Sequence, residues 1–298
     1  MKRNWCILAL LLVPVAWAQE VPYDQVQDHV YATIDGQDFY MDIFTPKAKD
    51  PALPGHGLAI VDVASGAWHA DRGKIEDHKK AQFYDIFTKH GYTVFAVRPG
   101  TRGMYTALEM VGHVKTAIRY IKAHAADYGI DPKRLGLTGP SAGGHLATLV
   151  ALTPEPGDPS ASDPLLQQST DVQAAGIFFP PTDFLNWNGN TNVAARLGDL
   201  YFKGGVNGHT PEEIEARAKE ISPRYQVKGK TPPFLIFHGD ADPMVPLQQS
   251  EVLVAALKEQ GNEVTFTVVP GGAHPWPTID QEVAKMADWF DAKLRTKS

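Results

Sequence analysis

Short apolar runs alternate along the chain with longer segments of helical periodicity. Each run has the length of a strand buried on both faces, as parallel strands of an α/β sheet are. The predicted strands are 58–64, 92–99, 131–139, 174–180, 233–239 and 263–270. The predicted helices are 79–91, 107–129, 145–152, 246–261 and 278–297. This alternation predicts an α/β fold with a mostly parallel central sheet and helices on both faces.

Three segments depart from this alternation. Residues 30–46 alternate apolar and polar positions around Asp35-Gly36, which predicts a β-hairpin. Residues 153–170 are rich in proline, serine and aspartate and show no periodicity, and residues 181–230 combine a glycine-rich stretch with one predicted helix. Both long segments follow strands at the edge where open α/β sheets bind ligands. We predict that 181–230 form a lid-like insertion.

The first 18 residues have the pattern of a secretory signal peptide. Lys2 and Arg3 precede an apolar run, and Ala16-Trp17-Ala18 places small residues at the two positions that signal peptidase reads. The run is shorter than the roughly 20 apolar residues that span a bilayer. We predict cleavage after Ala18, a secreted or periplasmic protein, and a single domain over 19–298.

Composition narrows the possible partners and chemistry. The chain has 298 residues, 43% of them hydrophobic, and a formal net charge of -6. This suits a globular domain and indicates neither a nucleic-acid partner nor an acidic membrane surface. The single cysteine, Cys6, falls within the predicted signal peptide. The mature chain would therefore have no disulfide, no thiolate ligand and no cysteine nucleophile.

One motif points to nucleophilic catalysis. Gly139-Pro140-Ser141-Ala142-Gly143 fits the pattern G-x-S-x-G and lies between a predicted strand and a predicted helix. In that context the serine is expected on a sharp, strained turn above the sheet, and a side chain at either glycine would clash with a neighbouring strand or helix. The alternative is an ordinary glycine-rich turn.

A serine nucleophile needs a histidine base oriented by a carboxylate. The histidines that follow Ser141 are His145, His209, His238 and His274. We choose His274, which follows a strand on a glycine loop before the last helix, and expect His145 to face structure. For the acid we choose Asp242 over Asp240, because Asp242 lies farther into its loop and can point back toward His274. Asp240 is expected to brace the turn.

Two further sets of residues complete the expected site. Backbone N–H donors for a tetrahedral oxyanion are expected from Ala142 and from Gly66 and Ala67, in the loop after strand 58–64. Aromatic residues near the predicted site could line a substrate pocket or pack in the core. The candidates for substrate contact are Trp68, Trp187 and Trp276, with Phe184 equally suited to the core.

Together these motifs resemble the α/β-hydrolase superfamily. The chain is similar to esterases related to hormone-sensitive lipase, to feruloyl and acetyl-xylan esterases, and to the catalytic domain of prolyl oligopeptidases. The shared stretches are 64–68, 139–147, 180–183, 238–246 and 271–276. The resemblance implies the α/β-hydrolase fold and a Ser-His-Asp mechanism that needs no metal or cofactor. Residues 69–78 lack the compact spacing of a metal site and are interpreted as a solvated loop.

The chain departs from this family at two positions. Ala64 replaces the histidine of the family's His-Gly-Gly-Gly-Trp stretch, so the bracing of that loop must come from elsewhere. Pro140 precedes the nucleophile, where a proline stiffens the turn but removes no N–H that the mechanism needs.

These observations favour a secreted serine carboxylesterase that acts on short-acyl or aryl esters of the acetyl or feruloyl type. Its expected partner is a small-molecule or polysaccharide-linked ester, with no nucleic acid and no membrane after signal cleavage. One alternative is an amide or peptide hydrolase of the prolyl oligopeptidase or arylformamidase type. The other is a non-catalytic binding protein on a hydrolase scaffold.

Overall fold

A computed structural model of the chain describes residues 21–295. The predicted signal peptide, 1–18, and Cys6 lie outside the described residues. Within 21–295, no helix has the length and apolar character needed to cross a membrane.

Eight strands form one sheet in the order β1-β2-β4-β3-β5-β6-β7-β8. The β1–β2 and β2–β4 pairs are antiparallel, and the remaining pairs are parallel. The strands are β1 (Tyr23–Ile34), β2 (Gln37–Pro46), β3 (Ala59–Val63), β4 (Thr93–Val97), β5 (Leu135–Pro140), β6 (Ala174–Phe178), β7 (Phe234–Gly239) and β8 (Val264–Val269). The mostly parallel sheet is confirmed, and the predicted hairpin begins seven residues earlier than 30, at Tyr23.

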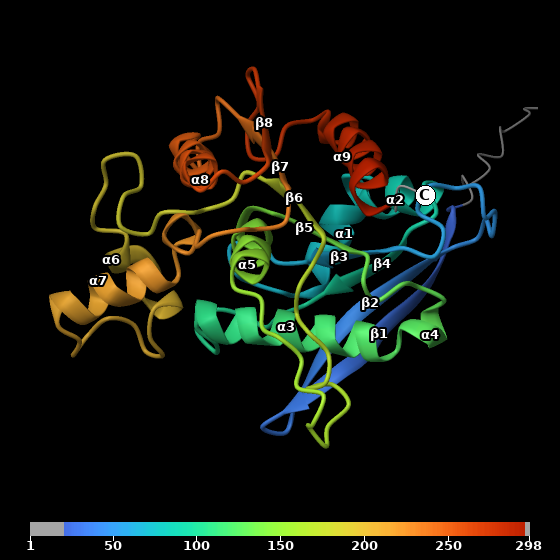
Figure 1. The fold of residues 1–298 in the computed structure, drawn as a ribbon. Helices are drawn as coiled ribbons and strands as arrows, with labels where there is room; N and C mark the ends of the chain where they lie inside the picture. The colour runs from blue at the N-terminus through green and yellow to red at the C-terminus, as the bar shows by residue number, and fades with distance from the viewer. Residues whose placement is uncertain (1–20, 296–298) are drawn as a thin grey trace, which may run out of the picture.

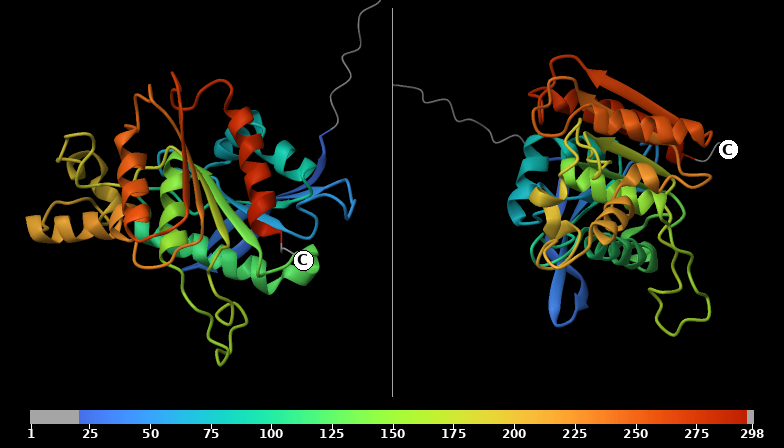
Figure 2. Two further views of the ribbon diagram at one scale, coloured as in Figure 1. Left: turned by 45° about the horizontal axis from the view of Figure 1, so that its top comes forward. Right: turned by 90° about the vertical axis from the view of Figure 1, so that its left-hand side faces the viewer.

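Helices cover both faces of the sheet (Figures 1 and 2). They are α1 (Arg72–Lys80), α2 (Phe83–Lys89), α3 (Ala107–Ala123), α4 (Ala125–Tyr128), α5 (Ser141–Leu152), α6 (Ala194–Leu197), α7 (Pro211–Glu220), α8 (Gln248–Glu259) and α9 (Ile279–Leu294). Helices α3, α5 and α8 pack on one face, and α1, α2 and α9 pack on the other. Strands β3, β4 and β6 lie between the two layers and are buried along their whole length.

The structure corrects two predictions on the first helical layer. The interpretation of 69–78 as a solvated loop is wrong, because α1 begins within it, with Asp71 accepting a hydrogen bond from the N–H of Gly73 as its cap. The predicted helix 79–91 is in fact the end of α1 followed by α2. The two helices are separated at Gln82, whose φ of 62° is left-handed. Of the residues of α1, Ile75 and His78 are buried, too few for a clear apolar periodicity.

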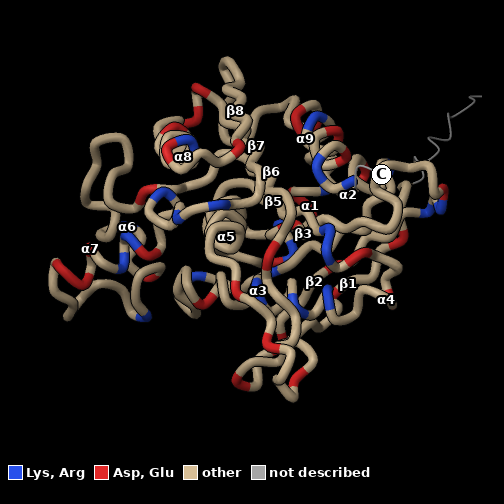
Figure 3. The backbone as a smooth tube through the Cα atoms, in the orientation of Figure 1, with Lys and Arg blue, Asp and Glu red and all other residues tan. Residues whose placement is uncertain are grey.

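The segment 181–230 extends from one end of the sheet and carries α6 and α7 (Figure 1). We call it the cap segment. It is joined to the main body by an ion pair between Asp199 and Arg102, and by a hydrogen bond of 2.8 Å from the N–H of Asp183 to Gln249 Oε1 of α8. Within the segment, Arg224 pairs with the buried Asp183 at 2.7 Å. Both acidic and basic residues lie on the outer helices α8 and α9 (Figure 3).

Candidate active site

Ser141 lies at the tight junction between β5 and α5. Its φ of 55° places a non-glycine residue in the left-handed region, a strained conformation typical of functional sites. A Cβ on Gly139 would lie 2.7 Å from the carbonyl carbon of Gly143, and a Cβ on Gly143 would lie 2.1 Å from the carbonyl oxygen of Val63. Both glycines are therefore required by the close crossing of β5, α5 and β3.

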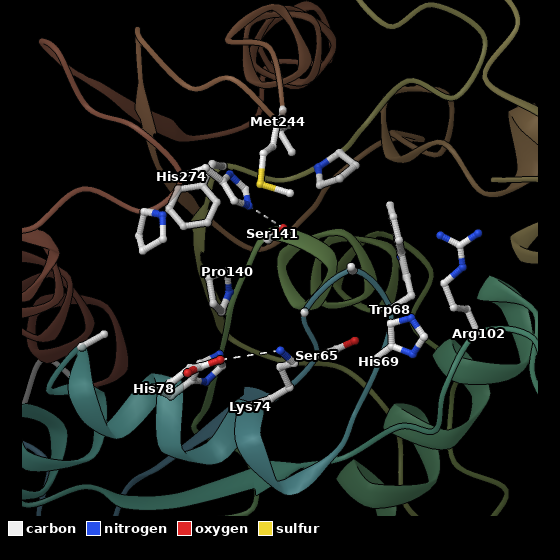
Figure 4. A pocket seen from close by; sticks show the side chains of 18 of the residues that line it. Ser65, Trp68, His69, Lys74, His78, Arg102, Pro140, Ser141, Met244 and His274 are labelled. Atoms are coloured by element: carbon white, nitrogen blue, oxygen red, sulfur yellow. Dashed lines mark hydrogen bonds and ion pairs between the residues drawn. The ribbon is translucent and has the colours of Figure 1, made fainter. Parts of the chain in front are cut away.

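A chain of hydrogen bonds links the three residues that the sequence selected. His274 Nε2 lies 2.8 Å from Ser141 Oγ (Figure 4), and His274 Nδ1 lies 2.6 Å from Asp242 Oδ2. Asp242 follows β7, and His274 follows β8, so parallel strands deliver both side chains to the edge of the sheet where α5 begins. The structure thus brings Ser141, His274 and Asp242 together, while their catalytic roles stay a prediction.

The surroundings of Asp242 keep its carboxylate charged. Burial alone would raise its pKa, but hydrogen bonds from His238, His274 and the backbone N–H of Val245 outweigh that effect and lower the pKa below its ordinary value. Oδ1 accepts from the N–H groups of Met244 and Val245 at 2.8 and 2.9 Å. Because the ionised carboxylate only accepts, His274 Nδ1 must carry a proton. In a neutral ring, Nε2 is then free to accept the proton of Ser141.

The remaining acidic and histidine candidates have structural partners. Asp240 Oδ1 accepts from the N–H of Gly271 at 2.6 Å, so this side chain braces the turn. His238 uses one ring nitrogen on Ser250 Oγ and the other on the carbonyl of Val245. His209 lies in the cap segment, stacked on the ring of Phe202. Of the candidate histidines, His274 is the one that contacts Ser141.

The loop after β3 closes in a tight two-residue turn, which we call the Gly66–His69 turn. The N–H of Gly66 donates to the carbonyl of His69 at 3.0 Å, and the reverse bond measures 2.9 Å. The central residues Ala67 and Trp68 have φ values of 49° and 60°. The predicted role of Gly66 as an oxyanion donor is therefore wrong, because its N–H is already used.

The donors left beside Ser141 are the N–H groups of Ala67 and Ala142. Ala67 has no hydrogen-bond acceptor for its N–H in the part of the chain that the structure describes. Ala142 is the second residue of α5, where an N–H has no partner within the helix. Ala142 follows the nucleophile in the chain and Ala67 lines the same cavity as Ser141, so they remain the candidate oxyanion donors.

His145 on α5 braces the Gly66–His69 turn. Trp68 Nε1 donates to His145 Nδ1 at 2.9 Å, and His145 Nε2 donates to the carbonyl of Ile221 at 2.7 Å. Burial lowers the pKa of His145 to about 4, so the ring is neutral near pH 7 and its partners fix the tautomer. This arrangement supplies the bracing that Ala64, in place of the family's histidine, cannot provide.

Ser141 and His274 open into a cavity of about 750 Å³ (Figure 4). This volume is within the range of roughly 300–1,000 Å³ found for small-molecule sites. Trp68, Trp187, Phe179 and Met244 are among the apolar residues that line it, and Arg196 from the cap segment lies over the Trp187 ring at 5.3 Å. The opposite end carries the polar side chains of Lys74, Asp77 and His78 from α1, beside the apolar ring of Phe83.

Two of the aromatic candidates belong to the core. Trp276 is buried, packs against Phe178 and Phe179, and donates from Nε1 to Glu282 Oε2 at 2.8 Å. It does not line the cavity, so the prediction of a substrate contact is wrong for this residue. Phe184 is also buried, against Trp68.

One group with metal-ligand chemistry lies away from the cavity. Ligand atoms of His90, Asp288 and Asp291 lie within 4.8 Å of one another. Asp291 already accepts from His90 Nδ1 at 2.8 Å and from the hydroxyl of Tyr92 at 2.7 Å. These bonds join α9 to the segment between α2 and β4, and they account for the cluster without an ion.

A family model named BD-FAE matches residues 41–257. The chain belongs to the BD-FAE family of α/β-hydrolases. Among solved structures, a truncated carbohydrate esterase from gut microbiota aligns with a TM-score of 0.78 at 28% identity, over 92% of this chain and 98% of that one. A propionate-bound esterase of Thermogutta terrifontis aligns with a TM-score of 0.68 at 25% identity, over 91% and 96% of the two chains.

Curated relatives carry esterase names. Esterase LipQ of Mycobacterium tuberculosis is 29% identical over 80% of this chain and 54% of its own length. An acetylxylan esterase of Xylanibacter ruminicola is 25% identical over 73% of this chain and 41% of its own. The chain thus spans about half the length of the curated relatives it matches.

Proposed function

We propose that this protein is a serine carboxylesterase with Ser141 as nucleophile, His274 as base and Asp242 as the residue that orients the base. The observation that carries the proposal is the continuous chain of hydrogen bonds from Ser141 Oγ through His274 to Asp242, at 2.8 and 2.6 Å. The strained backbone of Ser141, the BD-FAE family membership and the esterase names of the relatives support it.

In the proposed reaction, Ser141 Oγ attacks the ester carbonyl carbon and its proton passes to His274 Nε2. The N–H groups of Ala67 and Ala142 donate to the oxyanion of the tetrahedral intermediate. The intermediate collapses, the carbon–oxygen bond to the leaving group breaks, and His274 protonates the departing alcohol. Water then attacks the acyl-serine and gives a proton to His274, and the acid leaves as the proton returns to Ser141 Oγ.

The proposed substrates are short-acyl or aryl esters of hydroxylated alcohols, of the acetyl or feruloyl type. The cavity of about 750 Å³ has an apolar part beside Ser141 and a polar part farther away, which suits an ester with one apolar and one hydroxylated portion. The relatives named as an acetylxylan esterase and a carbohydrate esterase favour the same class.

Amide hydrolysis is the second candidate, because one relative is an uncharacterised peptidase of Bacillus subtilis, 23% identical over 71% of this chain. An ester and an amide that share one acyl group, such as p-nitrophenyl acetate and p-nitroacetanilide, separate the two activities. A larger kcat/KM for the amide would replace the esterase proposal.

The deciding experiment compares the mature protein with its Ser141→Ala variant on p-nitrophenyl esters from acetate to decanoate. We expect turnover of the short esters by the wild type and a loss of kcat of about 10³-fold or more in the variant. Thermal unfolding of both proteins controls for folding. If a folded wild type is as inert as the variant and resists a serine-directed phosphonate, the non-catalytic alternative replaces the esterase.

We further propose export and cleavage after Ala18, on the pattern of Lys2, Arg3 and the apolar run that follows. The intact mass of the protein recovered from outside the cytoplasm tests this. A mass that retains residues 1–18 would contradict it.

A further inference from the structure

A second aspartate–histidine pair borders the same cavity, at its polar end. Asp62 on β3 is fully buried, and its Oδ2 accepts from His78 Nδ1 at 2.7 Å and from the hydroxyl of Tyr84 at 3.0 Å. His78 on α1 is 6% exposed and lines the cavity (Figure 4). The pair repeats the Nδ1-to-carboxylate bond of His274 and Asp242 without a serine beside it.

The ring of His78 is fixed, yet one of its nitrogens is unused. Asp62 holds Nδ1, and the ring stacks on Phe83 with 5.2 Å between centroids. The buried rings of His145 and His238, in contrast, each satisfy both nitrogens with protein groups. Within residues 21–295, Nε2 of His78 has no such partner. A buried ring with one nitrogen available at a cavity wall is suited to bind a ligand.

Lys74 lies one turn before His78 on the same face of α1 and also lines the cavity. Its stem packs against the Gly66–His69 turn, since a Cβ on Gly66 would lie 2.9 Å from Lys74 Cδ and 3.4 Å from its Nζ. Its ammonium is 3.6 Å from Asp77. The hydroxyl of Ser65, another lining residue, is buried and has no partner among the described residues.

These groups decide the chemistry of the ligand. Lys74 donates, Asp77 accepts, and the hydroxyl of Ser65 can do both, so donors and acceptors stand side by side with offsetting charges. An apolar ligand would desolvate them without replacing their hydrogen bonds. An anionic ligand would meet the negative charges of Asp62 and Asp77. A hydroxyl group, which donates and accepts in turn, matches this wall.

We propose that the polar end of the cavity binds a hydroxyl group of the substrate, with His78 Nε2 as its hydrogen-bond partner and the Lys74 ammonium beside it. This inference rests on the proposed ester hydrolysis at Ser141. His78 and Lys74 determine specificity and take no part in cleaving the ester. The hydroxyl belongs either to a sugar ring in the alcohol portion or to a phenol in the acyl portion.

Two matched substrate pairs distinguish these sources. Methyl p-coumarate and methyl cinnamate differ only by the phenolic hydroxyl of the acyl portion. An acetylated methyl xyloside and cyclohexyl acetate differ chiefly by the ring oxygen and hydroxyls of the alcohol portion. For one pair we expect the wild type to favour the hydroxylated ester by about tenfold or more in kcat/KM, because a site built to bind a hydroxyl discriminates against the analogue that lacks it.

The variants are His78→Phe and Lys74→Met, with Lys89→Met as control, because Lys89 is an exposed lysine of the adjacent helix α2 and does not line the cavity. We expect the preference to fall toward one in the first two variants and to persist in the control. His78→Phe leaves Asp62 without its histidine and could fail to fold. Lys74→Met keeps the aliphatic stem that packs on Gly66, so this variant tests the subsite by itself.

Equal rates on both members of each pair in the wild type would overturn the subsite. A preference that survives in every folded variant of His78 and Lys74 would overturn it as well. Failure of the wild type to hydrolyse any ester would instead overturn the proposed function.

Discussion

The indole N–H of Trp68 donates a buried hydrogen bond of 2.9 Å to Nδ1 of His145. This bond joins the Gly66–His69 turn to the helix that begins with Ser141. The opposite nitrogen of His145 continues the connection to the carbonyl of Ile221 in the cap segment. The neutral imidazole of His145 thus fixes the relative positions of helix α5, the turn that carries the candidate oxyanion donor Ala67, and the cap segment.

Substitution of His145 should affect turnover more than substrate binding. His145→Leu leaves the Trp68 N–H and the Ile221 carbonyl unpaired, at about 1–3 kcal/mol for each buried group. The displaced turn should lower kcat about tenfold or more, because the loss of one oxyanion donor costs about 10²–10³ in kcat. His145→Gln, which offers an acceptor and a donor, is the matched variant and should recover part of kcat. Steady-state kinetics with thermal unfolding measure both, and an unchanged kcat in a folded His145→Leu variant would contradict the bracing role.

The low pKa of His145 predicts a specific dependence of stability on pH. The folded value is about 4, below the value of about 6.5 for an unperturbed histidine. The unfolded chain therefore binds more protons between these values, and the free energy of unfolding falls as pH drops from 6.5 toward 4. The slope from this group is up to about 1.4 kcal/mol per pH unit. Urea unfolding of the wild type and His145→Gln from pH 7 to 4 measures it. Identical slopes in the two proteins would rule out this titration.

Two tryptophans that look alike in the sequence should respond differently to alanine. Trp187 lines the cavity, so Trp187→Ala should raise KM for aryl esters about 2- to 10-fold, as the loss of an aromatic contact of about 0.5–1.5 kcal/mol implies. Trp276 is buried against Phe178, so Trp276→Ala should lower the free energy of unfolding by about 3–5 kcal/mol with little change in KM. Kinetics and denaturant unfolding on both variants provide the comparison, and the reverse pattern would show that the assignments are interchanged.

Much of the fold could be predicted because strands that are buried on both faces appear in the sequence as short apolar runs. β3, β4 and β6 are short, fully buried runs that are apolar except for Asp62 in β3 and Thr93 at the start of β4. The glycines around Ser141 indicate a crossing that is too close for side chains. The meeting of Ser141, Asp242 and His274 could also be predicted, because each follows a strand and parallel strands end at one edge of the sheet. The choice of Asp242 over Asp240 also agrees with the contacts, since Asp240 holds the N–H of Gly271.

What could not be predicted depends on tertiary contacts. α1 buries only Ile75 and His78, so its apolar face was too narrow to recognise. The turn that uses the N–H of Gly66 requires positive φ at Ala67 and Trp68, whereas such turns ordinarily prefer asparagine and glycine. The orientation of the Trp276 side chain depends on its hydrogen bond to Glu282 of α9. No sequence motif indicates that these two residues are in contact.

The anchoring of the cap segment determines how molecules reach Ser141. The carbonyl of Ile221 in the cap segment accepts from the buried ring of His145, and the N–H of Asp183 donates to Gln249 Oε1 of α8. Asp199 pairs with Arg102, whose own N–H donates to the carbonyl of Trp68. A swing of the cap would have to break these bonds together. The cavity is therefore a preformed pocket with a fixed entrance. A polymeric substrate would reach Ser141 only with the part that fits through this entrance.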